Sequence, residues 1–233
     1  MNNDQKEKRR AKFIADVGHD MKTPLNAVIG FTSVLLQDRE ALGAEKTRQL
    51  ELVYKSAHRL LGRVDALTEF FRLQAGVTGS GVDWFSPRQL IKETLDLFRD
   101  DAGEKGIQLQ IGAEPMPARM RSAARPLSRA LRELVANAVK FTTSGSVKVG
   151  LRCEAGRVTF EVADSGSGLG AGSLQKLKDA LGSRDNYEGL GLGLALSREA
   201  AAMLGGQVEV ESRPGSGSTF TLTMELTEDN LEM

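Results

Sequence analysis

The sequence predicts an α+β protein of two domains: an N-terminal helical hairpin that forms a four-helix bundle in a dimer, followed by an α/β sandwich. Three observations lead to this prediction. Two stretches in the first third repeat apolar residues every three or four positions, as amphipathic helices do. A glycine-rich stretch at residues 76–81 then interrupts the pattern. Beyond it, strand-like and helix-like segments alternate in a chain of 233 residues, which is long enough for two modest domains.

Composition narrows the class of protein. Charged residues make up 27% and hydrophobic residues 40% of the chain, as in globular proteins, and the net charge of zero predicts no nucleic-acid partner. Cys153 is the only cysteine, so an intrachain disulfide is excluded and a cytoplasmic location is favoured. No apolar run approaches the roughly 20 residues that cross a bilayer. We therefore expect no membrane contact within this segment, and a sensor or membrane anchor of a longer protein would lie outside it.

The first domain, residues 1–78, is predicted to contain two helices. The apolar stripe of the first consists of Ile14, Val17, Met21, Leu25, Val28, Thr32 and Leu35, and that of the second of Leu50, Val53, Ala57, Leu60, Val64, Leu67 and Phe71. A short link around residues 41–45 would join them. Because two such helices cannot enclose a core alone, we expect a homodimer with coiled-coil-like packing.

His19 lies on the first predicted helix and faces away from its apolar stripe. A histidine beside an acid, here Asp20, is a candidate nucleophile, because a carboxylate can fix the tautomer of the imidazole. Thr23 lies one turn on and shares this face, and Pro24 should bend the helix just beyond it. An ordinary exposed histidine would explain His19 taken alone, but these neighbours favour a functional role.

The second domain, residues 79–233, is predicted to begin with a strand at 82–85, a helix from Pro87 to about residue 103 and a strand at 107–111. A loop with two prolines leads to a helix over about 125–141. Strands near 147–153 and 158–163, a variable loop, a helix at 194–204 and two final strands complete it. Helices grouped against a mixed sheet make an α/β sandwich.

The helix over 125–141 carries Glu133, Asn137 and Lys140 on one polar face, followed by Phe141. An asparagine oxygen suits Mg²⁺, a lysine can meet phosphate charge, and a phenylalanine can pack against a base. A solvent-facing polar stripe would explain the same spacing.

Three glycine-rich segments strengthen the nucleotide interpretation. They comprise Asp164 with Gly166, Gly168 and Gly170 after a strand; Gly189, Gly191, Leu192 and Gly193 at the start of a helix; and a glycine turn that leads into Ser218. Glycines let backbone N–H groups approach phosphates, and a helix N-terminus adds a favourable dipole. No segment is a Walker A loop, since no Gly-Lys-Ser/Thr follows. Each alone is weak evidence, and their combination with His19 predicts a protein that binds ATP and phosphorylates the histidine.

Two sets of motifs resemble a known family. His19-Asp20-Met21-Lys22-Thr23-Pro24-Leu25 resembles the H-box of sensor histidine kinases of two-component systems. Glu133-x-x-x-Asn137, Asp164-x-Gly-x-Gly, Gly-x-Gly-x-Gly and Gly-x-Gly-Ser resemble, in this order, the N, G1, G2 and G3 boxes of the Bergerat ATP-binding fold. The resemblance covers nearly the whole chain. It implies a bacterial, cytoplasmic kinase that phosphorylates His19 from ATP and passes the phosphoryl group to an aspartate of a response-regulator receiver domain.

The resemblance also implies roles for individual residues. Asp164 would accept the adenine amino group with support from Ser218, and Lys140 would contact the phosphates. Asn137, together with Glu133, would hold Mg²⁺, so that ATP and Mg²⁺ are the expected cofactors. Residues 166–193 would form the ATP lid, and Thr23 would position a water molecule for the reverse phosphatase reaction.

Two departures from the family pattern keep other functions open. Glu133 stands where most histidine kinases carry asparagine, and it would either hold a metal-bound water or permit slow hydrolysis. The Phe-x-Pro-Phe of the F-box is absent, so Tyr187 or Leu181 would substitute as the packing residue. The alternatives are a nucleotide-binding pseudokinase or phosphatase scaffold with an altered lid, an ATPase driven by Glu133, and a purely structural helical dimer.

Overall fold

The computed structural model describes residues 3–76, 81–154, 156–183, 186–187 and 189–232. The chain folds as two compact units, Met1–Val77 and Thr78–Met233. The predicted domain boundary after residue 78 and most of the predicted linker fall on residues 77–80, outside the described residues. Within the described part of the chain, no helix combines the length and apolar character needed to span a membrane.

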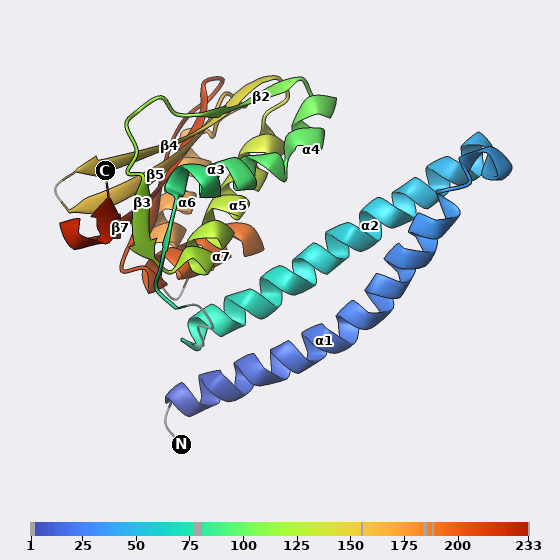
Figure 1. Cartoon of the computed structure of the whole chain (residues 1–233), viewed down its shortest axis with the longest axis horizontal. Coiled ribbons are helices and arrows are strands. Elements are labelled where there is room, and N and C mark those ends of the chain that lie inside the picture. The colour runs from blue at the N-terminus through green and yellow to red at the C-terminus, as the bar shows by residue number, and fades with distance from the viewer. Residues whose placement is uncertain (1–2, 77–80, 155, 184–185, 188, 233) are drawn as a thin grey trace. The chain divides into compact units, whose positions relative to one another are not determined.

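The first unit is a hairpin of two long helices, α1 (Asn3–Leu35) and α2 (Arg39–Gln74), drawn in blue to cyan in Figure 1. α1 runs unbroken through Pro24. The chain turns at residues 36–38, earlier than the predicted link, because the Asp38 carboxylate accepts a hydrogen bond from the Ala41 N–H (3.2 Å) and starts a helical turn there. Gly43 then interrupts α2 with a φ of 72°, so the predicted link marks a kink and not the turn itself.

The hairpin buries only part of its apolar surface. Ala57, Val64, Phe70 and Leu73 of α2 are buried, as predicted helix packing requires. Two rows of apolar side chains spaced seven residues apart are 42–50% exposed, namely Met21, Val28 and Leu35 on α1 and Val53, Leu60 and Leu67 on α2. A seven-residue repeat is the spacing with which helices pack in a coiled coil. The hairpin alone therefore leaves uncovered the surface that a second hairpin could bury.

The second unit is built on a five-stranded sheet of order β2-β4-β5-β7-β6. Its strands are β2 (Ile107–Ile111), β4 (Gly145–Glu154), β5 (Arg157–Asp164), β6 (Gln207–Arg213) and β7 (Gly217–Glu225). β2 pairs with β4 in parallel and the other neighbours are antiparallel, which confirms the predicted mixed sheet. Apolar residues alternate along these strands, and Phe160 and Leu222 lie fully buried on the same face.

Helices cover that apolar face. α5 (Ala124–Phe141) and α7 (Gly191–Met203) pack on each other and on the sheet, and α3 (Pro87–Asp96) packs on α5 (Figure 1). Leu131, Leu134 and Val135 of α5 are fully buried, so the apolar face predicted for this helix is confirmed. Together with the helical hairpin, this layer of helices on a mixed sheet is the predicted fold class.

Several elements differ from the sequence prediction. The helix expected from Pro87 to about residue 103 is divided into α3 and α4 (Arg99–Glu104), because the Phe98 N–H bonds to Leu95 three residues back and tightens the last turn of α3. β1 (Asp83–Phe85) pairs with β3 (Arg119–Ser122) in a separate sheet that β8 (Leu231–Glu232) completes after the short η1 helix (Glu228–Asn230). The variable loop contains α6 (Ala171–Gly182), whose Ala180 and Leu181 are buried.

Candidate functional site

His19 lies exposed on α1, as do Asp20 and Thr23. The Thr23 hydroxyl donates a long hydrogen bond (3.4 Å) to the backbone oxygen of His19, a bond that threonines form within helices. Among the described side chains, no hydrogen bond joins the Asp20 carboxylate to the His19 ring. The imidazole is therefore accessible to a reactant that approaches the hairpin from outside.

Contacts with α2 set the rotation of α1 around His19. Gly18 is buried, and a methyl group at this position would lie 2.4 Å from the Thr68 hydroxyl. One turn further on, Lys22 Nζ lies 2.6 Å from Asp65 Oδ1 of α2. With Gly18 turned toward α2, the next residue projects outward, which accounts for the exposure of His19.

Gly18→Ala is expected to destabilise the hairpin, because the new methyl group overlaps Thr68; overpacking of this kind costs about 1–3 kcal/mol. In a Thr68→Ala background the overlap is gone, and the same change should stabilise α1 by up to about 1 kcal/mol, since alanine favours helices over glycine. Thermal unfolding followed by helical circular dichroism, at one protein concentration, measures all four members of the cycle. If the effects of Gly18→Ala and Thr68→Ala on stability were additive, the inferred contact between positions 18 and 68 would be contradicted.

Two residues of the polar face of α5, Asn137 and Lys140, lie near the C-terminal end of that helix. Asn137 is half-buried, whereas Lys140 is exposed with its ammonium 4.8 Å from the ring centroid of Phe141. Lys105, in the turn after α4, donates to the backbone oxygens of Val139 (2.7 Å), Lys140 (3.1 Å) and Thr142 (3.3 Å). A lysine at a helix C-terminus satisfies carbonyl groups that have no partner within the helix. Lys105 thus holds the turn that carries Lys140 and Phe141.

Glu133 is held by an arginine of its own helix. Its Oε1 lies 3.0 Å from Nη2 of Arg129, and both side chains are less than one-fifth exposed. Its Oε2 points toward the start of α7, where a methyl group on Gly193 would lie 2.7 Å away. The ion pair with Arg129 thus occupies one carboxylate oxygen of Glu133 and leaves the other directed at the start of α7.

Asp164 ends β5 opposite Ser218 of β7. Its Oδ1 accepts a hydrogen bond from the Gly166 N–H (2.8 Å). Burial raises the pKa of the Asp164 carboxyl group, while hydrogen bonds from the backbone N–H groups of Gly166 and Ser218 lower the pKa and oppose that effect. Ser218 therefore supports Asp164 through its backbone, and its hydroxyl lies instead 3.0 Å from the Ser212 hydroxyl.

The glycines draw the predicted segments together by leaving no room for a side chain. A methyl group on Gly166 would lie 2.6 Å from the backbone oxygen of Phe141, and one on Gly217 would lie 1.8 Å from that of Asp164. The start of α7 approaches α5 at Glu133 through Gly193, so α5 contacts both the first and the second glycine segment, and the third contacts the first. They were predicted from separate stretches of sequence, and only the fold brings them into contact.

The remaining glycines lie in the two segments that flank α6. Gly168 has a φ of 65°, and a methyl group there would lie 2.0 Å from the Arg213 carbonyl oxygen, so only glycine fits. Gly170 precedes α6. Gly189 and Gly191 also have positive φ, and the helix that follows begins at Gly191, three residues before the predicted start, with Leu192 half-buried.

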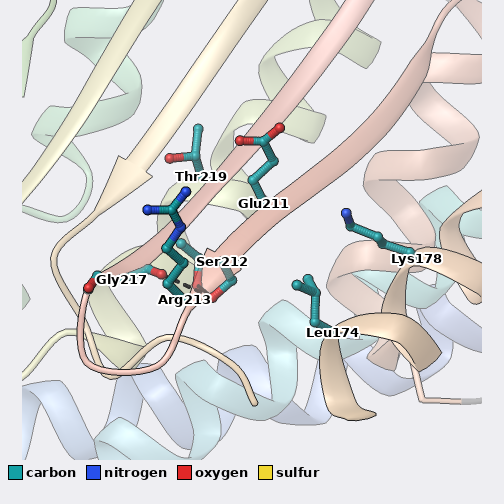
Figure 2. A pocket seen from close by; sticks show the side chains of 9 residues that line it. Leu174, Lys178, Glu211, Ser212, Arg213, Gly217 and Thr219 are labelled. Carbon is teal, nitrogen blue, oxygen red and sulfur yellow. Dashed lines mark hydrogen bonds between the residues drawn. The ribbon is translucent and has the colours of Figure 1, made fainter. Parts of the chain in front are cut away.

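Two neighbouring cavities lie beside α6. In the first, of about 520 Å³, Leu174 and Lys178 of α6 face Glu211, Arg213 and Thr219 on β6 and β7 (Figure 2). The second, of about 820 Å³, shares Lys178 with the first and extends to Arg198. Neither cavity is lined by Asn137 or Asp164, so neither coincides with the predicted adenine and metal residues.

Several residues of this region were not predicted as site residues. The Arg129–Glu133 pair could have been predicted from the sequence, since opposite charges four residues apart on a helix can pair. Lys105 and Ser212 could not: Lys105 acts across 34 residues, and the Ser212 hydroxyl accepts from the Leu169 N–H (2.8 Å) across 43. Tyr187 and Leu181, predicted as substitutes for the F-box, are half-buried and buried, respectively.

A helical hairpin with an exposed histidine, followed by a mixed-sheet domain in which an acid and glycine segments converge, is the two-domain arrangement that the sequence predicted. Comparison with known families agrees with this arrangement. Residues 9–76 match the family described as "His Kinase A (phospho-acceptor) domain". Residues 122–228 match "Histidine kinase-, DNA gyrase B-, and HSP90-like ATPase". The chain belongs to the sensor histidine kinases and contains their phosphoacceptor and ATP-binding domains.

Individual relatives are similar over most of this chain. It is 35% identical to "Sensor histidine kinase AruS" of Pseudomonas aeruginosa over 94% of this chain and 23% of that protein. It is 28% identical to "Autoinducer 2 sensor kinase/phosphatase LuxQ" of Vibrio vulnificus, over 95% and 27%. Among solved structures, full-length ShkA in complex with AMPPNP matches with a TM-score of 0.71 and 29% identity, over 91% of this chain and 45% of that one. The chain spans about a quarter of the length of the curated relatives it matches.

Proposed function

We propose that this chain is an ATP-dependent autophosphorylating protein histidine kinase that passes the phosphoryl group from His19 to an aspartate of a response-regulator receiver domain. The observation that carries the proposal is the convergence of Glu133, Asp164 and the glycine segments in one domain, with an exposed histidine beside an acid in the other. The matches to both kinase domains and to a relative solved with an ATP analogue support it.

Asp164, the start of α7 and Lys140 are the proposed contacts for ATP. The Asp164 carboxylate accepts the adenine amino group, while the backbone N–H groups of Gly166 and Ser218 orient it. Gly189, Gly191, Leu192 and Gly193 lie at the start of α7, whose free backbone N–H groups and dipole favour phosphate. Lys140, on the turn fixed by Lys105, provides positive charge for the phosphates.

Side-chain oxygens on α5 suit Mg²⁺, which prefers oxygen ligands. Asn137 offers a half-buried amide oxygen and is the proposed direct ligand. Glu133 has Oε1 engaged by Arg129, which leaves Oε2 to hold a metal-bound water. When bound with ATP, Mg²⁺ offsets charge on the phosphates.

His19 is the proposed nucleophile. A ring nitrogen of its imidazole forms a bond to the γ-phosphorus, the bond from phosphorus to the bridging oxygen breaks, and ADP leaves with that electron pair. Asp20 accepts a hydrogen bond from the N–H of the other ring nitrogen. It stabilises the positive charge that develops on the ring and favours release of the proton from that nitrogen. The exposure of both side chains allows this arrangement to form when the two domains meet.

A homodimer is proposed from the two heptad-spaced rows that the hairpin leaves exposed. Packing them against the same rows of a second copy completes a four-helix bundle.

Thr23→Ala is expected to abolish phosphatase activity toward the phosphorylated receiver domain and to leave autophosphorylation within about 2-fold, because the hydroxyl positions water only for the reverse reaction. Its bond to the His19 carbonyl is long (3.4 Å), so α1 should keep its stability. Release of phosphate from the labelled regulator and labelling of His19 are measured in parallel. Equal loss of both activities would count against the assigned role.

The function is tested by incubation with γ-labelled ATP and Mg²⁺, for wild type and His19→Ala, followed by acid and base treatment. Acid-labile, base-stable label in the wild type alone is expected, because His19 is the proposed acceptor. His58, the only other histidine, provides the control substitution His58→Ala, which should keep the label. ATP binding without label would support the pseudokinase or phosphatase scaffold, and release of free phosphate without phosphoprotein would support an ATPase.

A further inference from the structure

Arg198 of α7 is a buried charge that the proposed chemistry does not use. Its side chain is 6% exposed, and among the described residues it is the one charged side chain in the buried class. A guanidinium is costly to remove from water unless its N–H groups find acceptors. Its partners therefore indicate which parts of the structure it holds.

Those partners lie at the end of α6 and just before the second glycine segment. Nη1 donates to the backbone oxygens of Ala180 (2.8 Å), Ser183 and Asn186 (2.8 Å). Because Ala180 belongs to the last turn of α6, its carbonyl has no partner within the helix, and a cation there also complements the helix dipole.

Tyr187 covers the other side of the same guanidinium. The guanidinium carbon of Arg198 lies 4.2 Å from the ring centroid of Tyr187. Glu199 connects the two, since its Oε1 accepts from the Tyr187 hydroxyl (2.9 Å) and from Arg198 Nη2 (3.1 Å). Cation–π contact and shared hydrogen bonds thus attach Asn186 and Tyr187 to α7 at the same point as the end of α6.

We propose that Arg198 is a positioning residue that fastens the C-terminal end of α6 and residues 186–187 to α7. α6 follows the glycines of 166–170, and Tyr187 precedes those of 189–193. The chain lacks the Phe-x-Pro-Phe of the F-box. Arg198 and Tyr187 place a buried cation–π contact at this point, and displacement of the end of α6 would remove the bonds of Arg198 to Ala180 and Ser183.

The consequence for ATP rests on the proposed function. Neither Asp164 nor its N–H donors, Gly166 and Ser218, are among the described partners of Arg198, so recognition of adenine should not depend on it. Residues 186–187, which Arg198 attaches to α7 together with the end of α6, directly precede the glycines of 189–193 that are proposed for the phosphates. Loss of Arg198 should therefore weaken the binding of ATP more than that of adenosine.

The first test uses trypsin on the nucleotide-free protein. Lys176 and Lys178 lie exposed on α6, and cleavage after them requires this helix to open locally. Arg198→Met should accelerate this cleavage about 10-fold at temperatures well below unfolding. Arg198→Lys should be intermediate, because an ammonium reaches fewer acceptors and does not stack as a guanidinium does. Arg125→Met, which removes an exposed arginine from α5, should cleave like the wild type.

Tyr187→Ala keeps the test valid if Arg198→Met fails to fold, because it removes half of the contact without placing a change in the core. It should also accelerate cleavage after Lys176 and Lys178, whereas Tyr187→Phe, which keeps the ring, should have a smaller effect. Unchanged cleavage in both Arg198→Met and Tyr187→Ala would overturn the proposal.

Binding to the wild type and Arg198→Lys supplies the second readout. ATP affinity should fall at least about 10-fold and adenosine affinity less than about 3-fold, measured by titration calorimetry. Equal losses for both ligands would reduce Arg198 to a general contributor to folding and overturn its positioning role. A wild type that binds neither ligand would instead refute the proposed function and leave the cleavage result to decide the attachment of α6.

Discussion

Asp164→Asn is expected to weaken ATP binding about 100-fold, or about 2.7 kcal/mol. Oδ1 of Asp164 accepts the Gly166 N–H, and the carboxylate also accepts from the Ser218 N–H. An asparagine keeps one acceptor but replaces the second oxygen with an NH₂ group, which would face the adenine amino group, donor against donor. Binding weakens strongly when a hydrogen bond to the ligand is lost and a buried polar group is left without a partner.

Titration calorimetry with ATP measures this loss. Asp100→Asn, on an exposed position of α4, removes the same charge away from the site and should bind like the wild type. Circular dichroism of both variants shows whether the domain remains folded. Wild-type affinity in a folded Asp164→Asn protein would exclude the proposed contact with adenine.

The same carboxyl group predicts a dependence of stability on pH. Burial raises the pKa of Asp164 above its usual value of 3.8. Because the folded-state pKa lies above the unfolded one, this group stabilises the fold most below the unfolded pKa and loses that contribution as pH rises through the folded pKa. Asp164→Asn lacks the titration, so its stability relative to the wild type should improve between about pH 4 and about pH 6. Urea unfolding of both proteins at the two pH values measures this change. A difference in free energy of unfolding that is the same at both pH values would contradict the prediction.

Leu60→Glu is the second change with a large expected effect. Leu60 is 45% exposed and lies at the centre of the row formed with Val53 and Leu67. In a four-helix bundle of two chains this side chain is buried twice, once in each copy, so the substitution places two carboxylates in an apolar seam. We expect the dissociation constant of the dimer to rise at least about 100-fold.

Sedimentation over a range of protein concentrations measures the shift. Arg59→Glu adds a carboxylate at the neighbouring exposed position, about 100° around α2, and should leave the dimer intact. ATP binding by the second domain should survive in Leu60→Glu, because that domain has its own core. If the dimer of Leu60→Glu had the same dissociation constant as that of the wild type, the exposed rows would not be the dimer interface.

Much of the fold was predictable because it follows from local patterns. Three- and four-residue spacing of apolar residues predicted α1, α2 and α5, and the strands predicted near 147–153 and 158–163 lie within the observed bounds of β4 and β5. β3 and β8 could not be predicted in the same way. They are only four and two residues long. β3 pairs with both β1 and β8, and no local pattern in the sequence indicates that pairing.

In the candidate site, too, local features were predictable from the sequence and long-range contacts were not. The identities of His19, Asn137 and Asp164, the positions of the glycines and the absence of a Phe-x-Pro-Phe were determined by the sequence alone, because chemistry and backbone conformation depend on residue type. Tertiary structure alone decided that Arg129 engages Glu133, that Lys105 caps α5 and that Arg198 attaches α6 to α7. The last two of these contacts satisfy helix-end carbonyls with cations distant along the chain, and only folding determines which cation reaches which carbonyl.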